Sequence, residues 1–356
     1  MVLPTPKNEE QTEKQTDLST LIASLRAAVG VLNKQDIQAA ARAIGQTVTG
    51  KGNAQIRLGD DCAAIPDGDG YLLFASEGIW PQLVEQDPWF AGWCAVMVNL
   101  SDIAAMGGEA IAVVDALWSK SVENSQMLWA GMQAASQAYG VPIVGGHTNC
   151  HSPYEGLAVS VMGRSQQLIT SFDAQPGDAL VMVVNMAGAY HGEYSFWNAA
   201  TMADPEQLRE QLAQLPLLAA SGLCHAGKDI SMGGLAGTLL MLCEASGCGA
   251  LLDLGRVPRP AGAALEKWLT SFPSFGFLLS VSPENVEAVT ALFYPHGLTC
   301  QAIGEVRAGS QVIFQQFEEQ QMFWDLAVPL TGFGAAEITA KKCAERATEI
   351  NDPSHP

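Results

Sequence analysis

Four separate stretches of the sequence carry acidic side chains of the kind that bind divalent cations. The adjacent carboxylates of Asp60 and Asp61 come just before an apolar, strand-like run, and Glu77 follows the strand-like run YLLFA. Asp102 lies near the end of a long apolar helical stretch, and Asp229 precedes a glycine turn and a further helical stretch. Carboxylate oxygens are the ligands that Mg²⁺ prefers, so all five residues are candidate metal ligands. Taken singly, each also fits an ordinary turn, a helix cap or a solvated side chain.

The turn after Asp229 is a candidate phosphate site. Gly233 and Gly234 open an apolar-faced helical stretch, LAGTLLMLCEAS. The first backbone N–H groups of a helix are free to bind an anion, and the helix dipole adds partial positive charge. We therefore expect a phosphate at these glycines, with Asp229 as a metal ligand beside it. Lys228 is either a lone cation in the same site or a solvated side chain.

Asn99 shares one side of its predicted helix with Asp102. The two residues lie three positions apart in the apolar stretch of residues 91–106, so their side chains project in the same direction near the end of that helix. Such a pair is common as a surface hydrogen bond, but beside a metal ion it would suit nucleotide binding. Asn99 is therefore a candidate cofactor contact.

A second polar turn contains a candidate acid or base, His147. It follows Gly145 and Gly146, which close a strand-like run, permit close backbone approach and are candidate cofactor contacts. His147, Cys150 and His151 could also belong to a transition-metal site. No fourth ligand is evident and a proline follows, so we favour a polar turn at the mouth of a site.

The charge of the chain is strongly acidic and unevenly placed. There are 18 Lys and Arg against 37 Asp and Glu, a formal charge of −19, and residues 58–163 contain twelve acids but only one base, Lys120. This balance argues against nucleic acid and anionic membrane surfaces as partners. An anionic substrate in this region would need carboxylate-bound divalent cations to neutralise it.

The elements that must position these residues alternate between strand-like and helical patterns, which predicts an α/β fold. Within 356 residues we expect a disordered arm at 1–16, an N-terminal β-rich domain at 17–165, a C-terminal α/β domain at 166–307 and an appendage at 308–356. No apolar run of 18 residues and no signal-peptide pattern is present, and eight cysteines are spread without a CxxC motif. We expect a cytoplasmic protein with reduced thiols.

Several of these motifs, in this order, resemble one known family. GDDCAAI at 59–65, an acid ending a strand at Glu77, NLSDIAAMGG at 99–108, GGHTN at 145–149 and DISMGGL at 229–235 resemble the aminoimidazole ribonucleotide synthetase-like superfamily. Later runs, FPSFGFLLSV and IGEV, extend the likeness to about Val306. Thiamine-monophosphate kinase, selenophosphate synthetase and formylglycinamidine synthetase are members, and the chain is most similar to a subgroup described only as synthetase-related.

The resemblance implies a fold, a cofactor and an assembly. The N-terminal sheet would pair with that of a second subunit to form a barrel at a homodimer interface, and ATP with Mg²⁺ would lie between the two domains. In this chain the metal and phosphate ligands would be Asp60 or Asp61, Glu77, Asp102 and Asp229, and the nucleotide contacts Asn99, Gly233 and Gly234.

The chain also departs from its relatives. Thiamine-monophosphate kinases usually have Asp-Thr at Glu77-Gly78, and an Asp at both His147 and Met232. Selenophosphate synthetases carry a catalytic Cys or selenocysteine and a Lys in a Gly-rich N-terminal loop, whereas the arm before Leu18 has no Cys and no Gly. We therefore expect ATP- and Mg²⁺-dependent phosphoryl transfer to, or activation of, a different small molecule. The alternative is a nucleotide- or metabolite-binding protein without catalysis. Candidates for lining the acceptor pocket are Trp80, Trp89, Tyr190 and His191.

Overall fold

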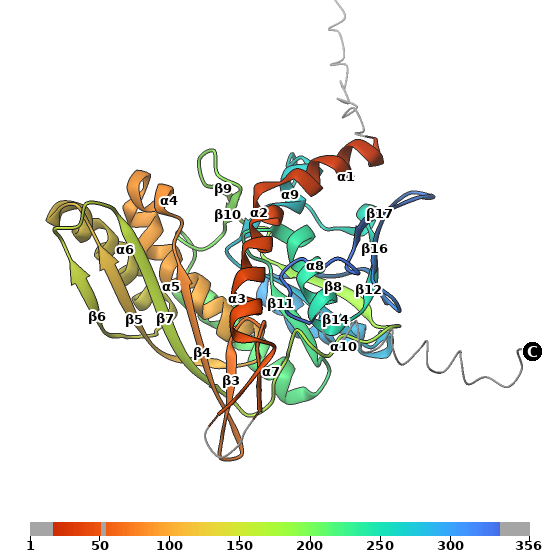
Figure 1. The fold of residues 1–356 in the computed structure, drawn as a ribbon, viewed down its shortest axis with the longest axis horizontal. Coiled ribbons are helices and arrows are strands. Elements are labelled where there is room, and N and C mark those ends of the chain that lie inside the picture. The colour runs from red at the N-terminus through yellow and green to blue at the C-terminus, as the bar shows by residue number, and fades with distance from the viewer. Residues whose placement is uncertain (1–16, 51–54, 335–356) are drawn as a thin grey trace, which may run out of the picture.

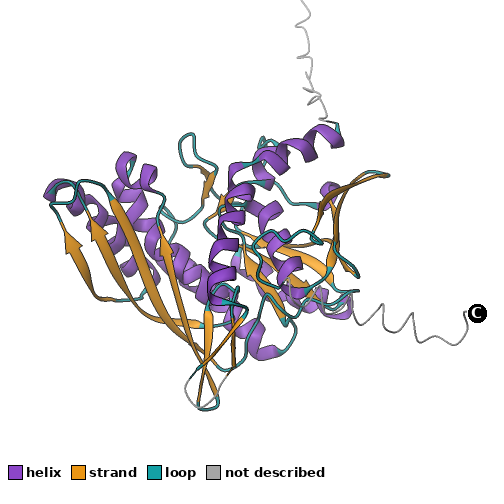
Figure 2. Ribbon diagram, in the orientation of Figure 1, coloured by secondary structure: helices purple, strands orange, loops and turns teal. Residues whose placement is uncertain are grey.

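The computed structural model describes residues 17–50 and 55–334, and Figure 1 shows their course. The described chain forms two α/β units with mixed sheets, the architecture expected from the sequence (Figure 2). The N-terminal arm at 1–16 and the last part of the predicted appendage, residues 335–356, lie outside the described residues.

The first domain is an open five-stranded sheet. In spatial order its strands are β3 (Ala63–Asp67), β4 (Gly70–Gly78), β7 (Gly156–Ser165), β5 (Glu109–Trp118) and β6 (Ile143–Asn149). Neighbouring strands are antiparallel except β5 and β6, which are parallel and are joined by helix α6 (Val122–Tyr139). Parallel neighbours require a crossover of this kind. The crossover leaves β6 at the edge of the sheet.

Helices α4 (Pro81–Gln86) and α5 (Pro88–Ala105) follow β4, and α5 packs between the sheet and α6. Val96 and Ile103 on the apolar face of α5 are fully buried. A Cβ atom on Gly92 would lie 2.1 Å from the carbonyl oxygen of Leu128, so this glycine lets α5 and α6 approach closely. Asp102 is thereby fixed near the end of a rigid, buried helix.

The other face of this sheet is apolar and exposed. The large apolar side chains exposed on its strands are Ile65, Phe74, Ile111, Val114, Val144 and Met162. Within the described chain the sheet does not close into a barrel. A barrel would need a second copy, so the homodimer stays a prediction.

The second domain is built on a seven-stranded mixed sheet. In spatial order its strands are β11 (Ala226–Asp229), β14 (Gly276–Val281), β8 (Ala179–Val184), β15 (Thr299–Arg307), β12 (Gly249–Asp253), β16 (Gln311–Gln316) and β17 (Glu319–Asp325). Helices α7 (Pro205–Ser221) and α10 (Val286–Phe293) cover one face, and α8 (Gly234–Ser246) covers the other. Side chains alternate between the faces, so Val181 and Val183 pack toward α7 and α10, whereas Leu180 and Met182 pack toward α8.

Residues that we assigned to an appendage from 308 instead complete this sheet. Strand β16 pairs in parallel with β12, and β17 pairs with β16. Val312 and Phe314 are fully buried in the core of the second domain. The prediction was wrong for this segment because its alternating apolar residues face that core.

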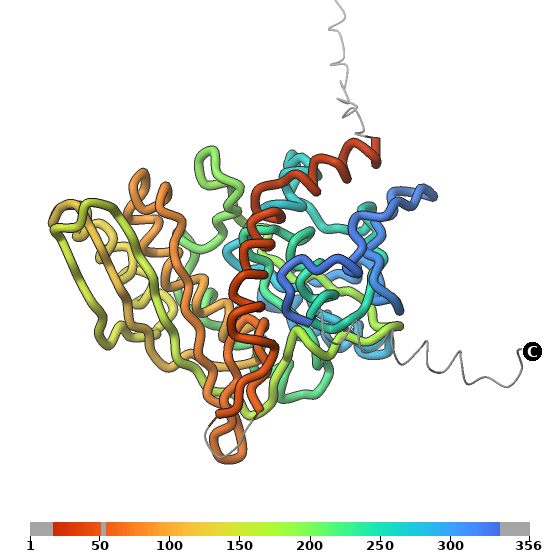
Figure 3. Tube along the Cα trace, viewed as in Figure 1, coloured from red at the N-terminus to blue at the C-terminus, as the bar shows by residue number. Residues whose placement is uncertain are grey.

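The N-terminal helices also belong to the second domain rather than to the first, where we placed them. They are α1 (Leu18–Ala27), α2 (Val29–Leu32), the short 3₁₀ helix η1 (Asn33–Asp36) and α3 (Ile37–Ile44). Leu18, Leu21, Ile22 and Leu25 of α1 are buried in the core of the second domain. Figure 3 shows this segment as a red tube that runs down beside the second domain.

Short elements complete the described fold. They are β1 (Thr47–Thr49), β2 (Gln55–Arg57), β9 (Ala189–Tyr190), β10 (Phe196–Asn198), β13 (Phe272–Pro273), α9 (Leu265–Leu269), η3 (Leu254–Arg256), η4 (Pro283–Asn285) and η5 (Tyr294–His296). Seven cysteines fall in the described residues, and none of these forms a disulfide. None of the helices described here is long and apolar enough to span a bilayer.

Candidate functional site

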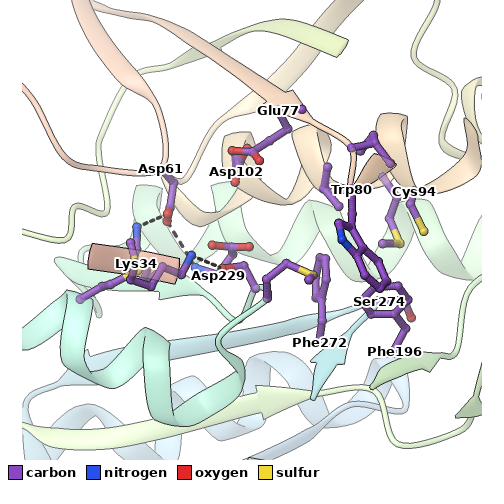
Figure 4. Close-up of a pocket in the computed structure, with 18 of the residues that line it drawn as sticks. Lys34, Asp61, Glu77, Trp80, Cys94, Asp102, Phe196, Asp229, Phe272 and Ser274 are labelled. Atoms are coloured by element: carbon purple, nitrogen blue, oxygen red, sulfur yellow. Dashed lines mark hydrogen bonds and ion pairs between the residues drawn. The ribbon is translucent and has the colours of Figure 1, made fainter. Parts of the chain in front are cut away.

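A cavity of about 560 Å³ lies between the two domains and is lined by residues of both and of the N-terminal helices. Figure 4 shows charged side chains on one side of it and aromatic ones on the other. The acidic end comprises Lys34, Asp60, Asp61, Glu77, Asp102, Lys228 and Asp229. The aromatic end comprises Trp80, Phe90, Cys94, Phe196, Phe272 and Ser274. All five acids that the sequence singled out therefore line one cavity.

Three of these acids form a compact cluster. Asp61 lies in the loop before β3, Asp102 near the end of α5 and Asp229 at the end of β11, and each offers an oxygen within 4.8 Å of the others. Elements from both domains thus bring together residues that are up to 168 positions apart in the sequence. This is the one group of three or more metal-ligating side chains found among the residues that the structure describes.

The chemistry of the cluster suits a hard divalent cation. Asp102 and Asp229 are only 6% and 4% exposed, and the Oδ2 atom of Asp102 is buried without a hydrogen-bond partner. Burial, together with the neighbouring carboxylates, raises the pKa of both side chains well above the usual value. A bound Mg²⁺ would relieve that repulsion and supply the missing partner, so the residues present fit this ion.

Lys228 contributes a buried positive charge to the acidic end. Its Nζ donates to Oδ1 of Asp61, and both side chains are under 5% exposed. The backbone N–H of Asp229 donates to Oδ2 of Asp61 at 3.3 Å. Burial acts to lower the pKa of Lys228, but the surrounding carboxylates, led by Asp61, outweigh it and raise that pKa. Of the two readings of Lys228 left open by the sequence, the cation in the site is the one found.

Lys34 is a second cation, which the sequence analysis missed. It lies in η1, and its Nζ donates to Oγ of Ser231 at 3.4 Å. Burial lowers the pKa of its ammonium group, and Asp229 acts in the opposite direction. The helix approaches this closely because Gly30 has no side chain: a Cβ there would lie 2.1 Å from the carbonyl oxygen of Met232. Gly30 in an otherwise apolar helix was the sequence signal from which this close approach could have been predicted.

Asp60 differs from its neighbour Asp61 because protein donors already occupy its carboxylate. The backbone N–H of Ser171 donates to its Oδ2 at 2.9 Å, and the Ser171 hydroxyl and the Asp61 N–H donate to its Oδ1. Burial raises the pKa of Asp60 to about 6, with a further contribution from Asp61. Asp60 therefore ties the loop before β3 to the segment that joins the domains, and Asp61 is the member of the pair that reaches the cluster.

Glu77 stands at the carboxyl end of β4 and points toward Asp102 in Figure 4. Burial raises its pKa, and Asp61 adds to the effect while Lys34 opposes it. Glu77 lies outside the three-residue cluster but lines the same cavity. Its place at a strand end is the one that the sequence indicated.

The three candidate nucleotide contacts in helices lie beside the cavity rather than in its wall. Asn99 is fully buried, and its Nδ2 donates to the Ala95 carbonyl at 2.8 Å while its Oδ1 has no partner. Gly233 caps α8, and Gly234 has a φ of +61° with no room for a Cβ. The turn before them does reach the cavity, at Ser231 and Met232. The fixed turn at Gly234 aims that segment at the acidic end.

His147 and the two glycines before it lie away from the cavity. All three are exposed on the edge strand β6, and none of them lines the cavity in this single chain. We expected His147 near an acceptor at this site; within one chain the structure does not bring it to the cavity, because β5 and β7 separate β6 from β4 in the sheet. Its role as an acid or base stays a prediction. Cys150 donates to Oγ of Ser125 instead of meeting the two histidines in a metal-ligating cluster.

The aromatic end was only partly foreseen. Trp80 lines it as expected, whereas Trp89, Tyr190 and His191 do not line the cavity. His191 lies behind the wall, stacked on Phe90 with ring centroids 3.6 Å apart. Phe196 and Phe272 come from the paired strands β10 and β13. Phe272 begins the run FPSFGFLLSV, which the sequence analysis used only as a sign of the family and not as part of a site. Phe196 lies in a short strand outside every motif, so nothing in the sequence indicated it.

These features define a class: two-domain α/β proteins with a carboxylate cluster in the cavity between the domains. Residues 59–165 match the N-terminal domain of AIR synthase related protein, and residues 175–315 match its C-terminal domain. The chain therefore belongs to the family of AIR synthase related proteins.

Relatives of the chain include proteins with assigned activities. It is 56% identical over 318 residues to an uncharacterized protein of Synechocystis, covering 89% of this chain and 98% of the relative. It is 28% identical over 270 residues to a thiamine-monophosphate kinase of Methanospirillum hungatei, covering 73% and 90%. A structure of PurL from Thermotoga maritima complexed with ADP shares the fold with a TM-score of 0.68 at 17% identity. That match covers 86% of this chain, which spans about half of the PurL chain, 52%.

Proposed function

We propose that this protein uses ATP and Mg²⁺ to transfer a phosphoryl group to a small molecule or to activate it. The observation that carries the proposal is the cluster of Asp61, Asp102 and Asp229, buried in a cavity between the two domains. Support comes from the family, whose members include thiamine-monophosphate kinases, and from the PurL structure with ADP. The acceptor differs from thiamine monophosphate, in keeping with the departures at Glu77, His147 and Met232.

In this proposal the carboxylates would hold the cation and Lys34 would contact a phosphate. Asp61, Asp102 and Asp229 would bind Mg²⁺, with Glu77 as a further carboxylate beside them. Bound there, Mg²⁺ neutralises the charge that develops on the phosphoryl oxygens. The bond from the γ-phosphorus to its bridging oxygen would break as the bond to the acceptor oxygen forms, and ADP would leave. The proton of an acceptor hydroxyl would pass to water or to the carboxylate of Glu77 in the cavity wall. Among the described residues Lys34 donates only one long hydrogen bond, to Ser231, so its ammonium group can turn toward a phosphate.

The homodimer forms part of this proposal. The exposed apolar face of the first sheet is suited to pairing with a second copy, as the resemblance implies. The edge strand β6 carries His147, Gly145 and Gly146, which reach no site in their own chain. In a paired barrel the edge of one sheet meets the other subunit, so these residues would act there. A sedimentation experiment on the full chain tests the dimer directly.

A non-catalytic binding protein is the second candidate, and one observation favours it. Met232 lines the cavity, at the position where thiamine-monophosphate kinases usually have a second Asp of that motif. A cluster with one fewer carboxylate could hold a nucleotide without turning it over. Release of ADP separates the two candidates, since a binding protein would retain ATP unchanged over a broad panel of metabolites.

Calorimetric titration of Mg²⁺ with AMPPCP, a non-hydrolysable ATP analogue, tests the proposal. We expect binding by the wild type that requires Mg²⁺ and is lost in Asp102→Asn. Asp115→Asn is a matched control, because Asp115 is equally buried at 6% and has unpartnered oxygens but lies outside the cavity. The proposal fails if wild type binds no analogue, or if both variants lose binding equally.

A further inference from the structure

The aromatic end of the cavity is chemically unlike the acidic end. None of the described residues that form it is charged, whereas all seven charged residues of the cavity wall lie in the acidic end. Trp80 keeps 41% of its surface exposed, although a large aromatic side chain is normally buried. An exposed indole beside two further rings is a ready surface for stacking a flat ligand.

The walls of this end are held in place from both domains before any ligand arrives. Tyr194, between β9 and β10 of the second domain, donates from its hydroxyl to Oε1 of Gln86 in the first domain at 2.8 Å. His191 pairs through Nε2 with Oδ2 of Asp87 at 2.8 Å. Trp80 packs edge-on against the Tyr194 ring, with centroids 6.0 Å apart. A preformed wall of this kind favours a rigid ligand, since little ordering is left to be done on binding.

Polar contacts at the aromatic end are few. The Ser274 hydroxyl accepts from the backbone N–H of Ala199 at 2.9 Å and keeps its own proton to donate to a ligand. Asn198, the amide on the cavity wall, uses both ends of its side chain within the protein: Nδ2 donates to Thr201, and Oδ1 accepts from Ala200 and Thr201. Among the side chains of the aromatic end, the Ser274 hydroxyl and the indole N–H of Trp80 are therefore the two strong donors open to a ligand.

Two classes of occupant are disfavoured on this evidence. A phosphate or carboxylate would be buried without a cation, because the two lysines of the cavity lie in the acidic end. Adenine would bury several ring nitrogens and an amino group against two side-chain donors, which leaves its amino group and some of its ring nitrogens without partners. A neutral aromatic molecule buries no charge and few polar atoms on entering, so it gives up few hydrogen bonds to water.

We propose that the aromatic end binds the acceptor, and that the acceptor is an uncharged molecule with a planar aromatic body and one hydrogen-bond acceptor for Ser274. This inference rests on the proposed function, since it assigns the second substrate of the same cavity. The reacting oxygen of the acceptor would project toward Glu77 and Asp102, and the nucleotide would reach the metal with its base outside the aromatic end.

The test uses the full chain with small probes and calorimetry. Indole and benzyl alcohol represent the neutral class, benzoate and phenyl phosphate the charged class, and adenosine the nucleotide base. We expect the neutral probes to bind at least about tenfold more tightly than the charged ones. Trp80→Ala should weaken indole by about tenfold and Trp80→Phe should largely restore it, with AMPPCP and Mg²⁺ binding unchanged in both. Tyr294→Ala, an exposed aromatic residue outside the cavity, is the control.

Several results would overturn the inference. Equal binding of charged and neutral probes would remove the argument from charge, and absence of neutral binding would remove the site. If adenosine displaces indole, or if Trp80→Ala weakens AMPPCP, the aromatic end holds the base instead. These outcomes are distinct from failure of the proposed function, which shows as absence of AMPPCP binding in wild type whatever the probes do. Trp80→Phe keeps the test valid should the alanine variant fold poorly.

Discussion

The two ends of the cavity affect the stability of the folded chain in opposite ways. In the acidic end five carboxyl groups face two ammonium groups, and four of these acids have raised pKa values because they are buried together. In the aromatic end the rings pack against one another and against the helix α5, so no described charge is left unpaired there.

This difference indicates which end of the cavity needs a bound ligand in order to be stable. The acidic end is strained by repulsion until a cation enters, whereas the aromatic end is satisfied by packing alone. Substitutions and ligand removal should therefore act on stability mainly through the acidic end. Substitutions at the two ends test this contrast.

Lys228→Met should have the largest effect on stability. It removes the partner of Asp61 and leaves a buried carboxylate beside two others, which costs about 3–5 kcal/mol when one member of a buried pair is lost. Chemical unfolding in the absence of Mg²⁺ measures the change. Lys120→Gln removes a lysine from an exposed pair with Glu85 and should change the free energy of unfolding far less, because solvent screens that pair. Equal losses in the two variants would show that the charge balance of the acidic end is unimportant.

Asp102→Asn should separate stability from activity. Without Mg²⁺ the variant relieves repulsion in the cluster, so its free energy of unfolding should equal or exceed that of the wild type. With Mg²⁺ and ATP its rate of ADP release should fall by about 10²–10³-fold, the usual cost of losing one group that stabilises transition-state charge. We therefore expect stability without Mg²⁺ to be kept or raised while the rate of ADP release falls. A variant that is less stable and still active would place the cation elsewhere.

The sequence singled out the acids of the cavity through the order of their motifs rather than through any one of them. Taken singly, Asp61, Glu77, Asp102 and Asp229 each fit an ordinary turn, cap or solvated side chain, whereas together they resemble one family, and the structure places all four in the wall of one cavity. The two-domain α/β fold followed from the alternation of strand-like and helical patterns. Asp60 could not be told from Asp61 by sequence, because only the distant partner Ser171 distinguishes them.

The parts that the sequence could not give depend on tertiary contacts. His147 also stands at a strand end, but its strand lies at the sheet edge, and the order of strands is set by packing rather than by local pattern. Lys34 is in a helix whose role is fixed only by the close approach of Gly30 to the turn at Met232. Residues 311–325 looked like an appendage because their partner strand β12 ends 58 positions earlier, Asp253 to Gln311.

Stability should depend on pH through the acidic end. The pKa of Asp60 is about 6 in the folded chain against a usual 3.8, so between these values the folded state holds a proton that the unfolded state releases. The free energy of unfolding should therefore fall as pH rises from 4 to 6, by at most about 3 kcal/mol from this residue. Glu77, Asp102 and Asp229 shift in the same direction.

Urea unfolding at several pH values without Mg²⁺ measures this slope. Asp60→Asn should flatten it, and saturating Mg²⁺ should reduce the part that comes from the metal-ligating cluster. In contrast, Trp80→Ala at the aromatic end should leave the slope unchanged. Stability that rises with pH over the same window would mean that the acids are not held together in the folded state as the cavity indicates.

Lys34→Gln should have the smallest effect on stability, and it tests directly whether Lys34 binds a phosphate. Lys34 makes no close ion pair among the contacts described, since its Nζ contacts only the Ser231 hydroxyl at 3.4 Å. Its removal should therefore change the free energy of unfolding little, unlike removal of Lys228. If it binds a phosphate, affinity for AMPPCP with Mg²⁺ should fall by about tenfold, the cost of one charge-assisted hydrogen bond. Lys34→Arg should retain most of the binding because it keeps the charge.

The position of Lys34 makes this result informative about the N-terminal helices as a whole. Residues 18–44 lie outside the two segments that match the family, yet they close the acidic end through η1. Weaker nucleotide binding with unchanged stability would assign them a part in the site. Unchanged binding would instead make Lys34 a counter-ion that offsets the excess of carboxylates. In that case Lys34→Gln would lower the free energy of unfolding without Mg²⁺ rather than the affinity for the nucleotide.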